Sequence, residues 1–286
     1  MNSVNRFAFQ ILLRLLPLLL LAGAFACACE DPLANRSIAK PETPDKTEKS
    51  SGGKSRKVPE MGACQVINVR VEELSGLCMT KDSTALWAVG DEGTLCKVSF
   101  SGAVTPVLSP GMDMEGVTLD PASGDLYLAI EGDQMVCRVA APDYRTVDTL
   151  FYIQEALERD FDNSGLEGIS FYKDSLLFVG SQEDAMLWTC KFDGTIVARR
   201  SLMEETSLIE EIAGLCYDPV KNWLWVTDSD ACKIFLFSAE TFDLLASYDI
   251  PSIDNAESIC VDRTHNCIWV GSDEDAPKLY KFSFTF

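Results

Sequence analysis

A phrase that recurs five times along the chain constrains the fold more than any other feature. Each copy has a small residue, a short apolar run, a polar turn and a second apolar run that ends in acids. The copies are "ELSGLCMTKDSTALWAVGDEG", "DMEGVTLDPASGDLYLAIEGD", "GLEGISFYKDSLLFVGSQED", "EIAGLCYDPVKNWLWVTDSD" and "NAESICVDRTHNCIWVGSDED". Self-similarity at a period of this length indicates a repeat architecture in which each copy is one structural unit.

The spacing of the copies predicts the kind of unit. Successive aligned small residues are 40, 52, 46 and 44 positions apart, and they are Gly76, Gly116, Gly168, Gly214 and Ser258. Two further strand-like runs complete each unit, as "TLCKVSF" and "AVTPVLS" do in the first. Four short strands in about 40–50 residues are typical of a β-propeller blade. We therefore predict an all-β, five-bladed propeller. A long connection at 141–165 leaves a sixth, irregular blade as the alternative to an insertion.

The two ends of the repeat region predict how the ring closes. The fifth unit stops after "KLYKFSFTF", its third strand, while "CQVINVRV" at 64–71 precedes the first unit and reads as one more strand. An N-terminal strand that completes the last blade would close the ring and leave no free sheet edge. The predicted propeller domain spans residues 61–286.

The repeats also resemble a known family. The segments "ELSGL", "LWAVGDEG", "GLEGI" and "LWVTDSD" are similar to those of the SdiA-regulated family of bacterial envelope β-propellers, over roughly residues 66–284. The resemblance implies a propeller fold and a place in the cell envelope. It implies no reaction, because the family name reports regulation in one lineage.

The N-terminus has the pattern of an export signal. Arg6 precedes the apolar run "ILLRLLPLLLLAGAFA", which ends in small residues. "AFAC" and "ACAC" resemble a bacterial lipobox, so we expect residues 1–29 to be a signal peptide and Cys29 or Cys27 to be lipidated. We predict a lipoprotein of the outer membrane, attached through its lipid anchor alone; simple secretion is the alternative. Residues 30–60 hold too few apolar groups to fold, which predicts a disordered tether.

The charge of the propeller region limits its partners. Residues 61–286 carry 15 basic and 38 acidic side chains. Such a surface repels nucleic-acid phosphates and favours cations. We therefore expect no nucleic acid, and a monomer whose partner is an unknown envelope protein or small ligand.

The cysteines do not read as a disulfide scaffold. The chain has 11, and none forms a C-x-x-C pair, which argues against structural zinc. Most fall in apolar, strand-like runs, so we expect small buried side chains and leave one or two disulfides open.

Acidic residues recur where each blade meets the axis. Strands alternate in direction, so the start of the first strand and the end of the second share one face of the disc. Three glutamates directly precede the aligned small residue, and we predict them as metal ligands: Glu115, Glu167 and Glu257. Other carboxylates are expected around the same channel mouth as an acidic binding surface: Glu73, Asp91, Asp133, Glu183, Asp228 and Asp273. Oxygen ligands without cysteine or histidine favour Ca²⁺; a solvated rim that binds nothing is the alternative.

Two classes of function fit this pattern. A rigid disc on an anchored tether suits a binding or scaffold module, which we favour. The alternative is a calcium-dependent hydrolase of esters, lactones or phosphates, since the Glu-Gly phrase more distantly resembles that of calcium-dependent propeller lactonases and phytases. Histidine chemistry is disfavoured, because His265 is the single histidine and falls in a turn on the opposite face.

Overall fold

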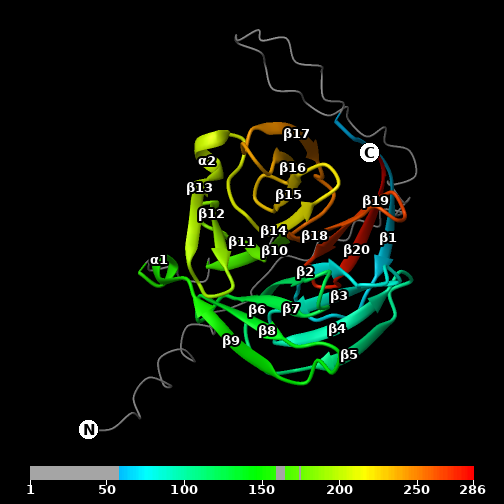
Figure 1. Ribbon diagram of the computed structural model, residues 1–286. Coiled ribbons are helices and arrows are strands. Elements are labelled where there is room, and N and C mark those ends of the chain that lie inside the picture. The colour runs from blue at the N-terminus through cyan, green and yellow to red at the C-terminus, as the bar shows by residue number, and fades with distance from the viewer. Residues whose placement is uncertain (1–57, 159–164, 174) are drawn as a thin grey trace, which may run out of the picture. The chain divides into compact units, whose positions relative to one another are not determined.

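Five sheets form the molecule that the sequence predicts. The structure is a computed structural model that describes residues 58–158, 165–173 and 175–286. Its strands make five four-stranded antiparallel sheets arranged in a ring (Figure 1), which confirms the five-bladed propeller. The predicted signal peptide, Cys27, Cys29 and the tether up to residue 57 lie outside the described residues.

Blades 1 to 4 use their strands in chain order from the axis outwards. Their innermost strands converge near the centre of the ring in Figure 1. The strands, blade by blade, are β2 (Leu74–Met79), β3 (Ala85–Gly90), β4 (Thr94–Ser99) and β5 (Val104–Leu108); β6 (Met114–Leu119), β7 (Leu126–Ile130), β8 (Met135–Val139) and β9 (Val147–Tyr152); β10 (Leu166–Tyr172), β11 (Leu176–Ser181), β12 (Met186–Lys191) and β13 (Ile196–Ser201); β14 (Gly214–Asp218), β15 (Trp223–Asp228), β16 (Lys233–Ser238) and β17 (Leu244–Asp249).

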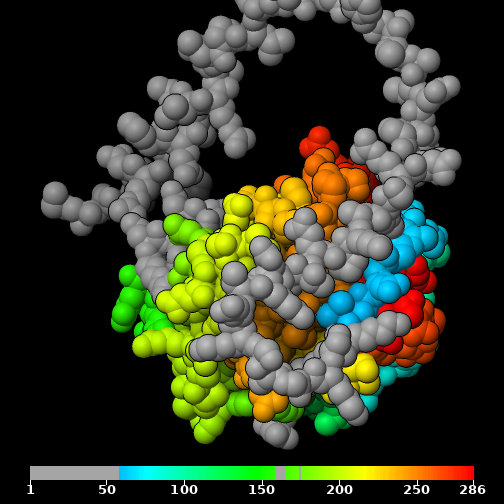
Figure 2. Space-filling view, turned by 90° about the horizontal axis from the view of Figure 1, so that it is seen from above, coloured from blue at the N-terminus to red at the C-terminus, as the bar shows by residue number. Residues whose placement is uncertain are grey.

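Blade 5 closes the ring with strands from both ends of the domain. β18 (Ala256–Asp262), β19 (Cys267–Ser272) and β20 (Lys278–Thr285) come from the C-terminus, and β1 (Glu60–Asn68) completes the sheet. β1 pairs antiparallel with β20, and the blue first strand lies against red C-terminal segments in Figure 2. The predicted closure is confirmed. It removes a free edge and couples residues more than 200 positions apart.

The long 141–165 connection contains the last strand of blade 2 rather than a separate blade. β9 pairs with β8, and the short helix α1 (Gln154–Leu157) follows it. The described residues therefore give no sixth blade. A second short helix, α2 (Leu202–Glu205), follows β13. In the described part of the chain, neither helix has the length and apolar character needed to cross a membrane.

A belt of side chains ties the innermost strands together. Thr118 Oγ1 accepts a hydrogen bond from the N–H of Phe171 at 2.8 Å, and Ser170 Oγ accepts one from Tyr217 at 2.8 Å. Cys216 Sγ accepts the N–H of Val261 at 3.3 Å. All three acceptors lie two residues after the aligned Gly. Each satisfies an N–H group that the next blade leaves unpaired at its inner edge.

Cysteine recurs at this position of the repeat. Cys78 and Cys260 occupy the same repeat position as Cys216, Thr118 and Ser170. The nine cysteines that the structure describes are all free thiols, so no disulfide is found among them. Cys216 also serves as a hydrogen-bond acceptor.

The acceptor role of Cys216 predicts a difference between two substitutions. Cys216→Val should lower the free energy of unfolding by about 1–2 kcal/mol, because the Val261 N–H loses its partner. Cys216→Ser should cost less, since serine already performs this role at Ser170. Urea unfolding of both variants checks the difference, and equal losses would contradict it.

Candidate functional site

A backbone irregularity aims the acidic side chains at the channel. Leu74 pairs with Gly90 and Gly76 with Val89, so Ser75 is an extra residue, a β-bulge. The pairing of blades 2, 3 and 5 shifts at the equivalent place, and the residues that precede the aligned small residue there are Glu115, Glu167 and Glu257. Bulges turn a side chain away from its regular direction. The residue before the aligned Gly is therefore the one that the fold directs out of the sheet.

The aligned glycines allow the inner strands to touch at these bulges. A Cβ atom on Gly116 would lie 2.4 Å from the carbonyl oxygen of Glu167, and one on Gly214 would lie 2.6 Å from that of Glu257. The axial space that remains has a cavity volume of about 10 Å³, room for roughly one water. Glu115 and Glu167 are among the residues that line it. The inner strands of neighbouring blades thus touch, and little space is left at the axis beside these acids.

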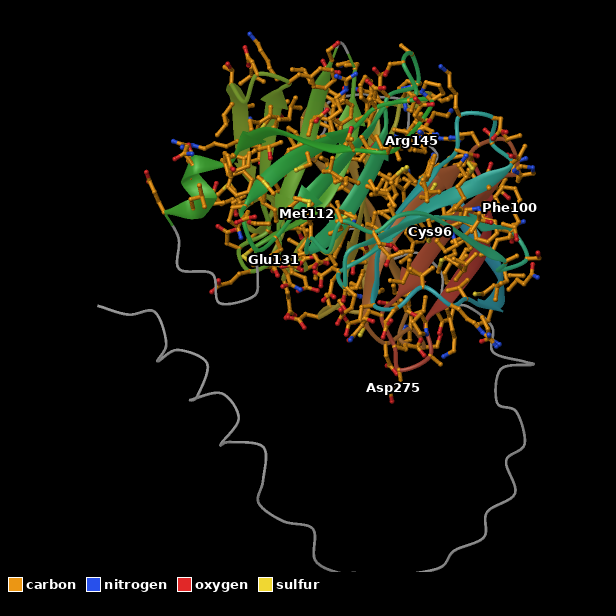
Figure 3. The ribbon with its side chains drawn as sticks, turned by 90° about the horizontal axis from the view of Figure 1, so that it is seen from below. Cys96, Phe100, Met112, Glu131, Arg145 and Asp275 are labelled. Carbon is orange, nitrogen blue, oxygen red and sulfur yellow. The ribbon has the colours of Figure 1, made fainter. Side chains whose placement is uncertain are left out.

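In blades 1, 2 and 5, an acid directly follows the second strand. Asp91 donates its N–H to the carbonyl of Glu73, and Glu131 to that of Asp113, both at 3.1 Å. Asp273 bonds to Asn255 in the same way at 3.0 Å. These bonds hold the residue after the second strand beside the residue before the first. Figure 3 shows the labelled Glu131 and Asp275 along the lower edge of the disc, and Arg145 towards the upper one.

The predicted residues divide into an inner and an outer group. Glu115 and Glu167 are buried, and Glu257 is nearly so; Asp91 and Asp273 directly follow the second strands of their blades, with Glu73 beside Asp91. Asp228 is instead the buried last residue of β15, and its carboxylate accepts the backbone N–H groups of Glu210 and Ala231, both at 2.7 Å. Asp133 and Glu183, by contrast, are exposed in turns. The structure puts Glu131 and Gln182 at the equivalent positions in those two blades, two and one residues earlier.

The structure also adds carboxylates that sequence reasoning did not select as site residues. They are Asp113, Glu131 and Glu211. Glu131 Oε1 accepts the N–H of Gly165 at 2.7 Å, and Glu211 Oε1 accepts those of Ser229 and Asp230 at 2.9 and 3.1 Å. Glu131 is the first residue after the second strand of its blade, so counting from the end of that strand would have identified it. Acids three residues before the aligned Gly mark Asp113 and Glu211.

Burial makes this mouth costly to ionise. Burial, reinforced by the neighbouring carboxylates, raises the pKa of Glu115 to about 9 and of Glu257 to about 8. The same causes raise the pKa of Asp91 to about 7 and that of Glu167 well above its usual range. Within the described residues, no ion pair joins these four carboxyls to a lysine or arginine. A bare mouth therefore keeps protons that carboxylates normally lose.

Carboxyl groups in the mouth act on one another as well as being buried. Beyond burial, Asp113 raises the pKa of Glu115, and Glu73 raises that of Asp91. Glu115 and Glu257 likewise add to the effect of burial on the pKa of Glu167.

Two groups of these oxygens are spaced to surround a cation. One oxygen each from Asp91, Asp113 and Glu115 lies within 4.8 Å of the others, and the same holds for Glu73, Asp91 and Glu92. Ligand oxygens bind Ca²⁺ at 2.3–2.6 Å, so two on opposite sides of the ion are up to about 5 Å apart. These acidic clusters can therefore hold a metal ion.

His265 takes no part in the mouth. It lies in the turn between β18 and β19, where its Nδ1 is 2.7 Å from Oδ2 of the buried Asp262. The aromatic ring of Phe100 contacts the imidazole, with ring centroids 5.2 Å apart. This is the opposite end of the strands from Glu257, as the sequence predicts.

Comparison with known proteins now adds the family. The family model described as SdiA-regulated matches residues 63–283. The chain belongs to the SdiA-regulated family. A search of curated proteins finds no match. The suspected resemblance is thus confirmed, and it covers all five blades of this SdiA-regulated protein.

Solved structures resemble this SdiA-regulated propeller at low sequence identity. Glutaminyl cyclase of Myxococcus xanthus has a TM-score of 0.59 and 14% identity, with 79% of this chain and 96% of that chain covered. XC5397 of Xanthomonas campestris, titled a gluconolactonase, has a TM-score of 0.54 and 13% identity, with 79% and 90% covered. A nidogen/laminin complex matches at 0.51 and 14%, with 71% and 73% covered. These likenesses show the fold alone.

Proposed function

We propose that this SdiA-regulated protein is a lipid-anchored binding or scaffold module of the cell envelope that carries a divalent cation, Ca²⁺ by preference, at its acidic mouth. One observation carries the metal: the oxygens of Asp91, Asp113 and Glu115 lie within 4.8 Å of one another with no basic partner among the described residues. The export pattern and the tether-like sequence support the location.

The ligands in this proposal come from two neighbouring blades. Asp91 follows the second strand of blade 1, and Asp113 and Glu115 begin blade 2. Asp91 also forms a second triad with Glu73 and Glu92. The carboxylates of these two residues can therefore supply further oxygens to an ion bound at Asp91. Oxygen-only ligands suit a hard cation, and Ca²⁺ tolerates the irregular geometry that three inequivalent carboxylates impose. Glu257, farther around the ring, belongs to neither triad; burial, reinforced by Glu211 and Asp273, raises its pKa.

The binding role follows from the mouth's form. The axial space holds roughly one water, so a partner must contact the rim and its turns rather than enter the channel. A cation at Asp91 would face such a partner, because Asp91 and Asp113 are partly exposed. We propose a monomer that engages an envelope protein or a small ligand there, and no nucleic acid.

A hydrolase of esters, lactones or phosphates is the second candidate, and one observation favours it. Glu115 has a pKa of about 9 beside carboxylates, as a general acid next to a Lewis-acidic metal requires. The gluconolactonase and cyclase titles of the fold neighbours suit this candidate only by analogy of fold. The small axial space requires that any substrate react at the rim.

Calcium titration tests the proposal. Calorimetry of the purified, metal-stripped protein should show stoichiometric Ca²⁺ binding, and Asp113→Asn should weaken it by about tenfold or more, since one of three facing carboxylates is lost. Asp133→Asn, which removes an exposed acid of the same blade, should leave the affinity unchanged. Absence of heat together with an unshifted melting temperature, or equal effects of the two variants, would remove the metal from the proposal.

A further inference from the structure

One buried amide beside the mouth has an oxygen that the fold leaves without a partner. Gln134 lies just before β8 and is 8% exposed. Its Nε2 donates to the backbone oxygen of Glu131 at 2.7 Å, which sets the orientation of the amide. Gln134 Oε1 then accepts no hydrogen bond from any residue in the described chain. A buried acceptor without a hydrogen-bond partner lowers the stability of the fold. A bound ion or water molecule would supply the missing partner.

The surroundings of this oxygen are carboxylates. The amide lies against Gly165: a Cβ atom there would be 1.9 Å from Gln134 Nε2 and 2.8 Å from Oε1. The Gly165 N–H donates to Glu131 Oε1 at 2.7 Å, so the Glu131 carboxyl also lies beside Gly165. Glu167 lies close enough to Glu131 for the two carboxyls to interact electrostatically, and both side chains are at most 6% exposed. The side chains of Gln134, Glu131 and Glu167 are therefore all buried where blade 2 meets blade 3.

The acceptor atoms of these three side chains limit the kind of ligand that can bind. An amide oxygen is a pure acceptor, and a carboxylate accepts as well. Side-chain amide oxygens and carboxylates together are ligands of Ca²⁺, whereas transition metals prefer nitrogen or sulfur. A water could also donate to Gln134 Oε1, but it would bring no charge to offset two buried carboxyls. A cation satisfies the orphan oxygen and relieves the carboxyl pair at once.

We propose that Gln134, Glu131 and Glu167 form a second seat for a hard divalent cation, at the junction of blades 2 and 3. It shares no ligand with the cluster of Asp91, Asp113 and Glu115 at the junction of blades 1 and 2. Glycine at 165 leaves the space that the Gln134 amide occupies. The two seats make the mouth a two-cation site, in which the second ion is more deeply buried than the first.

Counting bound ions in matched variants tests this seat. Calorimetry of the metal-stripped protein with Ca²⁺ alone should give two equivalents. Gln134→Met keeps the length of the side chain but removes its oxygen, and it should weaken one equivalent at least tenfold and leave the other. Asp113→Asn should do the reverse. Gln154→Met, at an exposed glutamine that begins α1, is the control and should change neither.

Two results would overturn the seat. One is a single equivalent in the wild type that Asp113→Asn abolishes, which would leave the first cluster standing and remove the second. The other is two equivalents that Gln134→Met leaves unchanged, which would assign a water to the orphan oxygen. If Gln134→Met unfolds, Gln134→Glu remains informative: an added carboxylate should bind the second ion several-fold more tightly, and an unchanged or weaker affinity contradicts the proposal.

Discussion

Gly116→Ala should lower the free energy of unfolding by about 3 kcal/mol, because a single methyl group has no space at the axis. The new Cβ would lie 2.4 Å from the carbonyl oxygen of Glu167 and 2.9 Å from Cγ2 of Ile169. The carbonyl belongs to the next inner strand, which the whole of blade 3 holds in place, so the contact cannot relax by rotation of a side chain. Urea unfolding followed by tryptophan fluorescence measures the loss.

A second glycine in the same blade controls for the substitution itself. A Cβ on Gly132 would meet the flexible carboxyl end of Asp113 at 3.1 Å, so Gly132→Ala should cost much less. Similar losses at the two positions would mean that the inner strands do not depend on backbone contact at the axis. Such a result would also remove our reason for the glycine in the repeated phrase.

The metal-free protein should become less stable as pH rises from about 5 to 9, opposite to the usual behaviour of carboxylates. Below the ordinary pKa of a glutamate, both folded and unfolded chains are protonated and the mouth imposes no charge penalty. Above it, the unfolded chain ionises while Glu115 and Glu257 stay protonated up to pKa values of about 9 and 8. Their stabilising contribution is therefore lost progressively across this window.

The size of this effect should be easy to measure. Each unit of pKa shift is worth about 1.4 kcal/mol, and 1 kcal/mol moves the melting temperature of a domain of this size by about 2–4 °C. Several shifted groups should thus lower the melting temperature by about 10 °C between pH 5.5 and 9. Thermal melts in chelator measure it, and Ca²⁺ should restore most of the loss at pH 9 if the proposed sites bind it.

Glu115→Gln separates the charge penalty from general effects of alkali. The amide has nearly the same shape and cannot ionise, so the variant should be more stable than wild type at pH 9 without metal, and should gain less from Ca²⁺. A wild-type melting temperature that rises with pH, or a variant that is less stable at every pH, would contradict the buried-acid account of the mouth.

Much of the architecture was available from local pattern. The recurrence of Gly76, Gly116, Gly168, Gly214 and Ser258 predicts five blades, and the leftover strand near residue 64 predicts the closure that β1 makes with β20. The same recurrence places the acids on one face, because strand direction alternates within every blade. These predictions hold because each rests on periodicity within a blade, and a blade is a local structure.

The composition of the site depended on tertiary structure. Asp133 and Glu183 fit the acidic pattern as well as Glu131 does, but the strand pairing puts Glu131 and Gln182 beside the axis and leaves the other two exposed. Gln134 carries no sequence signal, and its oxygen is an orphan only because Gly165, from the next blade, allows the amide to lie there. The sequence by itself determined the blades, their number and the face that carries the acids. Only closure of the ring decided which carboxyls meet, since those contacts join residues from different blades and no local pattern records them.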